Sequence, residues 1–127
     1  MLERLAELER RSRCLDVDGA QRQQWLQAVQ QYGEDFLNRL PDALTYRADD
    51  GRNGFANHHF DEQPSDLNEL LEFFQREIDT TGIQSTSGGQ MGYVPGGGLY
   101  PSALGDYLAA ITNRYATVSY AGPGAAR

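Results

Sequence analysis

The segment DGAQRQQWLQAVQQYGEDFLNRLP, residues 18–41, is the longest periodic stretch of the 127-residue sequence, and it predicts the fold class. Asp16 or Asp18 can accept hydrogen bonds from the first free amides of a helix, and Pro41 ends the pattern. Gly33 lies inside the apolar stripe, where it either loosens the helix or lets a neighbour approach closely. The stripe recurs every three or four positions, as one helix face requires, and consists of Trp25, Leu26, Val29, Tyr32, Phe36, Leu37 and Leu40.

The same periodicity predicts two further helices. One begins at Ser65 or Asp66 and ends before Gly82, with an apolar face made of Leu67, Leu70, Leu71, Phe73, Phe74 and Ile78. Another begins near Pro101, which suits a first helical turn because its missing N–H is no loss there. Its apolar face consists of Leu104, Tyr107, Leu108, Ile111 and Tyr115. Residues 117–120 could then begin a strand.

Long irregular segments connect these helices. Residues 42–64 have no sustained period and are rich in Asp, Asn and Gly, which is typical of a connection. Compact bundles use much shorter connections, and three stripes offer too few faces to cover one another. We therefore predict a mainly α chain of three amphipathic helices joined by long loops, forming a part of something larger. Residues 1–86 are expected to be a helical segment. Residues 87–127 are expected to contain a glycine-rich loop, a helix and the start of another domain.

The composition limits the classes of partner. Eighteen acidic residues against eleven basic ones give a net charge of −7, which repels nucleic-acid phosphates and anionic lipid. The N-terminal MLERLAELERR lacks the apolar core of a signal peptide, and no stretch approaches the ~20 apolar residues of a membrane span. The single cysteine, Cys14, cannot form an internal disulfide. We expect a cytoplasmic protein without nucleic-acid or membrane partners.

A glycine-rich stretch, SGGQMGYVPGGG at residues 87–98, precedes the third helix. A flexible tether would gain nothing from its Tyr, Val and Pro. A Walker-type phosphate loop needs a lysine and a hydroxyl residue after its last glycine, and Leu99 and Tyr100 stand there instead. Two interpretations remain. Glycines and Pro95 could form a rigid backbone that presents Tyr93 and Val94 to a ligand, or these side chains could simply pack under the following helix.

Few other residues suggest catalysis or metal binding. His58 and His59 are adjacent, so they would point in opposite directions on an extended chain, and we expect solvated loop histidines. The sequence has no paired cysteines, HExxH motif or EF-hand spacing, so no metal site is predicted. The serines and threonines at 85–87 are far in sequence from any histidine, so no hydrolytic triad and no catalytic residue is predicted.

From Phe36 onward, three segments carry a family resemblance. They are FLNRLPDA at 36–43, PSDLNELLEFF at 64–74 and SGGQMGYVPGGGLYPSALGDYLAAITNRYATVSYAGPG at 87–124. The chain resembles the N-terminal segment of the group II decarboxylases, the pyridoxal-phosphate-dependent, aromatic-L-amino-acid decarboxylase-like family. The glycines after Pro95 are similar to one subgroup and differ from the animal aromatic decarboxylases, so the resemblance does not name the amino acid.

The resemblance implies a fold, a partner and a set of pocket residues. It implies the N-terminal part of a fold-type I, aminotransferase-like enzyme, and removal of the carboxylate of an amino-acid substrate as carbon dioxide. Residues 1–86 would be the helical segment through which a homodimer forms. Residues 87–127 would hold the glycine-rich pocket loop, a helix and the truncated start of the pyridoxal-phosphate-dependent large domain. Matched to the family's pocket-lining loop, Tyr93, Val94, Pro95 and Gly96 would shape the substrate side of the site. Tyr120, in the segment before the AGP turn, would border it.

All eleven basic residues of the chain are arginines. The family holds pyridoxal 5'-phosphate through a lysine that lies well after the region seen here, so this chain would not anchor the cofactor. We therefore expect an inactive N-terminal fragment of an active carboxy-lyase. The alternative is a stand-alone helical dimerisation or binding module without catalytic activity.

Overall fold

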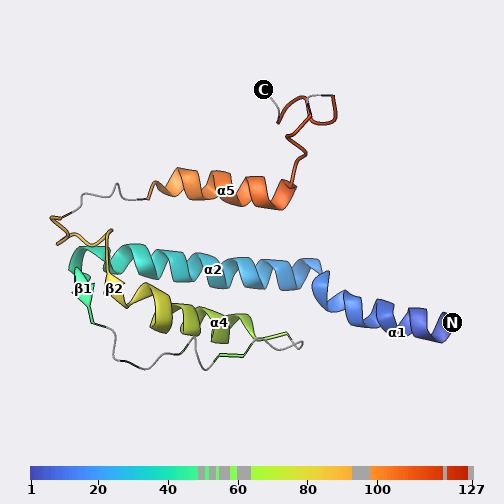
Figure 1. Cartoon of the computed structure of the whole chain (residues 1–127), viewed down its shortest axis with the longest axis horizontal. Coiled ribbons are helices and arrows are strands. Elements are labelled where there is room, and N and C mark those ends of the chain that lie inside the picture. Colours follow the sequence, from blue (N-terminus) through green and yellow to red (C-terminus); the bar gives the residue numbers. More distant parts are fainter. Residues whose placement is uncertain are drawn as a thin grey trace. The chain divides into compact units, whose positions relative to one another are not determined.

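The computed structural model describes residues 1–48, 51, 54, 58–59, 64–92, 98–118 and 120–125, and at Cys14 the backbone only. The chain divides into two compact units, Met1–Val94 and Pro95–Arg127, which are described separately. Helices dominate the described residues (Figure 1), which confirms the mainly α class. The functional division between residues 86 and 87 stays a prediction.

The first helix, α1 (Leu2–Ser12), was not predicted. Its leucines at positions 2, 5 and 8 follow helical spacing, but they are too few for the long stripe on which the other helices were recognised. Ion pairs one turn apart support it, from Arg10 to Glu7 at 2.7 Å and from Arg13 to Glu9 at 2.9 Å. A 3-10 turn, Arg13–Leu15, follows.

The predicted central helix is α2 (Gly19–Arg39). Of the two proposed caps, Asp18 is the one used, and its carboxylate accepts a hydrogen bond from the Gln21 amide at 2.9 Å. Pro41 lies in the 3-10 turn Leu40–Asp42 that ends the helix, as its position in the sequence predicts. No atom lies within 4 Å of a Cβ built on Gly33, so within the described chain no neighbour approaches it closely.

The next helix, α4 (Leu67–Phe74), begins at Asp66, whose side chain accepts hydrogen bonds from the amides of Asn68 and Glu69 at 2.8 and 3.4 Å. It widens into a π-helical turn, Gln75–Asp79, and the chain then turns at Gly82 with φ +75°. Wide turns of this kind often occur at functional positions. This one shifts Asp79 relative to a regular helix, so it decides where that carboxylate lies.

Two short strands pair near the ends of α2 and α4. Strand β1 (Tyr46–Arg47) pairs antiparallel with β2 (Gly82–Ile83), with Tyr46 opposite Ile83. A loop was predicted where β1 lies, because a strand of two residues is too short to show the alternation of apolar and polar residues that marks a strand. The ladder brings the segment after α4 back to the end of α2, where the two helices lie side by side (Figure 1).

A serine fixes the segment after β2. Ser87 is 6% exposed, its hydroxyl donates to the Ala43 carbonyl at 2.6 Å, and it accepts a hydrogen bond from the Gly89 amide at 3.2 Å. The Gly88 amide donates to the Leu40 carbonyl at 3.1 Å. Residues 87–89 are therefore tied to the residues that follow α2.

Apolar burial is shallow in the first unit. Among the described residues no apolar side chain is buried, and even Trp25 is 40% exposed. Only part of the apolar stripe of α2 is covered by α4. Tyr32 packs edge-on against Phe74 of α4, with ring centroids 5.9 Å apart, whereas Leu26, Val29 and Leu37 remain exposed. The prediction that the stripes cannot cover one another agrees with this arrangement.

The second unit contains α5 (Tyr100–Thr112), with Pro101 in its first turn as predicted. Asn113 ends the helix in the left-handed conformation, with φ 40°, and its amide donates to the Ala109 carbonyl. The possible strand at 117–120 is wrong for the described residues there, because Thr117 and Val118 form a bend and Tyr120 a turn. The amides of Ala121 and Gly122 instead donate to the Val118 carbonyl. The apolar side chains of α5 are exposed within their unit.

Candidate functional site

The residues assigned to a substrate pocket fall mostly outside the described part of the chain. Tyr93, Val94, Pro95 and Gly96 belong to the residues on which the structure gives no description. Tyr120 is described, lies in the second unit and is 88% exposed. Their assignment to a substrate pocket therefore stays a prediction.

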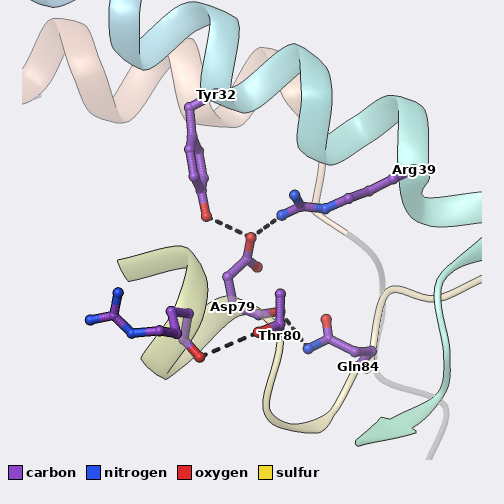
Figure 2. A network of polar contacts seen from close by, with 6 residues as sticks. Tyr32, Arg39, Asp79, Thr80 and Gln84 are labelled. Carbon is purple, nitrogen blue, oxygen red and sulfur yellow. Dashed lines mark hydrogen bonds and ion pairs between the residues drawn. The ribbon is translucent and has the colours of Figure 1, made fainter. Parts of the chain in front are cut away.

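The structure instead assembles a polar cluster between α2 and the end of α4 (Figure 2). The Tyr32 hydroxyl donates to Oδ2 of Asp79 at 2.6 Å, and Nη2 of Arg39 donates to the same oxygen. Tyr32 and Arg39 are seven residues apart, so they share one face of α2. The Asp79 side chain is 11% exposed, and this near-burial of a carboxylate is tolerated because a cation and a hydroxyl both face it.

The environment of Tyr32 changes its acidity. Desolvation by burial, assisted by the hydrogen bond to the Asp79 carboxylate, raises the pKa of Tyr32 from 10.0 to about 12, although Arg39 acts in the opposite direction. The hydroxyl therefore keeps its proton, and its role as donor to Asp79, to a higher pH than an ordinary tyrosine would. The Arg39 guanidinium carbon also lies 5.4 Å from the Phe36 ring centroid and 5.9 Å from that of Tyr32.

The backbone around Asp79 is held by further hydrogen bonds, which Figure 2 also shows. Nε2 of Gln84 donates to the Asp79 carbonyl at 2.6 Å, and the Thr80 hydroxyl donates to the Arg76 carbonyl at 3.3 Å. The cluster is thus anchored from α2, from the π-helical turn and from the segment after β2.

A cavity of about 240 Å³ opens beside this cluster, at the end of α2. Its walls are apolar at Phe36, Leu40, Ala43 and Leu44, and polar or charged at Arg39, Asp42, Arg47, Asp79, Thr80 and Gln84. Two guanidinium groups and two carboxylates balance in formal charge. Among the described residues, this lining holds no histidine or cysteine.

The residues present do not fit pyridoxal phosphate as a covalently held group. An aldehyde cofactor of this kind is bound through a lysine amine, and the sequence has no lysine. The cationic groups of the cavity are guanidiniums, which stay protonated at physiological pH and are poor nucleophiles.

The two histidines differ from each other. The His58 ring lies against Phe73, with centroids 4.5 Å apart, and is half-buried, whereas His59 is exposed as expected. Within the described residues, no three His, Cys, Asp or Glu side chains gather closely enough to hold a metal ion.

The sequence analysis did not identify Arg39, Asp79, Gln84 or Ser87 as interacting residues. Asp79 is 47 positions from Tyr32 and 40 from Arg39, and a single sequence gives no signal for such long-range pairs. One signal in the sequence could have indicated the cluster. Tyr32, Phe36 and Arg39 share one face of the helix, and an arginine beside aromatic side chains needs a counter-charge.

None of the helices in the described residues combines the length and the apolar character needed to cross a bilayer. Comparisons of the chain with protein-family models, with curated proteins and with solved structures found no match.

Proposed function

We propose that this chain is the N-terminal, dimer-forming and substrate-pocket-lining part of a pyridoxal-phosphate-dependent amino-acid decarboxylase. The observation that carries the proposal is the segment at 87–124, whose sequence resembles the pocket-lining region of that family. The residues that hold the cofactor would lie in a part of the enzyme that this sequence does not include. The contribution of this chain would be to bind the partner subunit and to shape the substrate pocket.

The exposed apolar faces support the dimer-forming role. Leu26, Val29 and Leu37 belong to the apolar face of α2, and each is 41–49% exposed. An aliphatic side chain gains about 1.5–3 kcal/mol on full burial, so a second copy of the chain that covered this face would stabilise both copies. The chain on its own is therefore expected to self-associate or to be poorly soluble.

A stand-alone helical dimerisation or binding module is the second candidate. The same exposed faces favour it, and so does the absence of lysine, because a binding module needs no cofactor anchor. The two candidates differ in what the full reading frame encodes. A decarboxylase needs a lysine-bearing domain after this segment, whereas a binding module does not.

The deciding experiment measures release of carbon dioxide from amino acids by the product of the complete reading frame, with pyridoxal phosphate present. We expect activity from that product and none from the 127-residue chain alone. In the active protein, Tyr93→Ala should change the ranking of substrates, whereas Tyr100→Ala, at the start of α5, should change it less. Activity of the isolated chain, or an inactive full-length product that contains no lysine, would reject the decarboxylase proposal.

A further inference from the structure

The cavity at the end of α2 contains two charges that the polar cluster does not use. Arg39 and Asp79 neutralise each other, and Tyr32 shares the same carboxylate oxygen. Arg47 and Asp42 also line the cavity, yet neither side chain makes a hydrogen bond or ion pair within the described part of the chain. One cationic and one anionic group are therefore available to a ligand.

The size of the cavity limits what could enter. Its volume of about 240 Å³ equals that of roughly eight water molecules in the liquid, and it lies just below the range of about 300–1,000 Å³ that is usual for drug-sized ligands. A nucleotide is too large for it, and a lone inorganic ion would leave its apolar walls at Phe36, Leu40 and Leu44 uncovered.

We propose that this cavity binds a free α-amino acid with an aliphatic side chain. Arg47 would pair with the carboxylate, Asp42 with the ammonium group, and the side chain would lie against Phe36, Leu40 and Leu44. A zwitterion matches one unpaired charge of each sign, and a guanidinium can hold a carboxylate by two parallel hydrogen bonds. The proposal does not depend on the decarboxylase assignment.

The experiment compares three ligands that share the isobutyl side chain of leucine, titrated into the 127-residue chain and followed by NMR. L-Leucine carries both charged groups, isopentylamine lacks the carboxylate and isocaproate lacks the ammonium group. We expect saturable shifts from L-leucine at the amides around Leu44 and Thr80. Binding of either analogue should be roughly tenfold weaker, because each leaves one charged protein group without its partner.

Two substitutions assign the contacts. Arg47→Gln should reduce the affinity for L-leucine roughly tenfold and leave isopentylamine binding unchanged, because that analogue has no carboxylate to lose. Asp42→Asn should weaken L-leucine binding and leave isocaproate binding unchanged. Arg114→Gln and Asp106→Asn are the matched controls: they make the same charge changes in the second unit, at residues that do not line the cavity, and should leave all three affinities unaltered.

Arg47 and Asp42 are both exposed, so their substitution should not unfold the chain, and an unchanged circular dichroism spectrum checks this. Absence of saturable L-leucine binding would overturn the proposal. Equal affinity for the three ligands, shifts confined to residues outside the cavity, or an Arg47→Gln variant that still prefers L-leucine to isopentylamine would also overturn it.

Discussion

The ionisation of Tyr32 depends on its surroundings in the folded chain. Its folded-state pKa is about 12, against 10.0 without those surroundings. Between these values the unfolded chain loses the phenolic proton while the folded chain retains it. The stability that the protonated hydroxyl contributes is therefore complete below pH 10 and is lost as the pH rises towards 12.

We expect the packing of α2 on α4 to weaken across this alkaline window. The ring signals of Phe74, which contacts Tyr32, report it directly by NMR. Tyr32→Phe removes the ionising group, so it should flatten the pH dependence of those signals between pH 10 and 12. An identical alkaline transition in Tyr32→Phe would show that another group causes it.

Ser87 should be far more sensitive to substitution than its neighbours. Ser87→Ala removes the hydrogen bonds to the Ala43 carbonyl and from the Gly89 amide. The cost is about 1–3 kcal/mol, because these groups lose their partner in a buried setting. Faster hydrogen exchange of the Gly88 and Gly89 amides would record it. Ser85→Ala, at an exposed serine two residues earlier, is the matched control, and equal effects of the two substitutions would contradict the anchoring role.

At the scale of secondary-structure elements, the glycine in the middle of α2, Gly33, has two explanations. It either loosens the helix or lets a neighbour approach closely. No atom lies within 4 Å of a Cβ placed there, so Gly33→Ala should stabilise the dilute, monomeric chain by roughly 0.5–1 kcal/mol through helix propensity. Urea unfolding monitored by helical circular dichroism measures this. Gly105→Ala in α5, where the surrounding space is also open, is the control.

The concentration dependence of the same variant tests the second explanation. A glycine that lets another copy approach closely would make Gly33→Ala weaken self-association while it stabilises the monomer. Lower stability at every concentration would contradict both the open space around Gly33 and the propensity argument.

Helices could be predicted from the sequence wherever local residues determine where they begin and end. Asp18 and Asp66 are caps in sequence and in structure, and Pro41 and Pro101 stand at helix ends as their missing N–H groups require. The helix α1 was missed because its stripe is short. The π-helical turn Gln75–Asp79 was not predicted, because helical periodicity does not distinguish a single wide turn from a regular one.

At the scale of the whole molecule, the site was less predictable than the fold. The cavity exists because β1 and β2 pair across 34 intervening positions, from Arg47 to Gly82, and neither strand has a period of its own. The exposed apolar faces, by contrast, could be inferred from the sequence, because the number of stripes and the length of the connections already left them uncovered.

The partial exposure of Trp25 on α2 has an optical consequence. The chain contains one tryptophan, Trp25, and its indole is 40% open to water on that helix. Its emission colour therefore depends on whatever comes to lie over this part of α2, without any attached dye. A blue shift of the Trp25 emission as the protein concentration rises would show that this surface loses its contact with water.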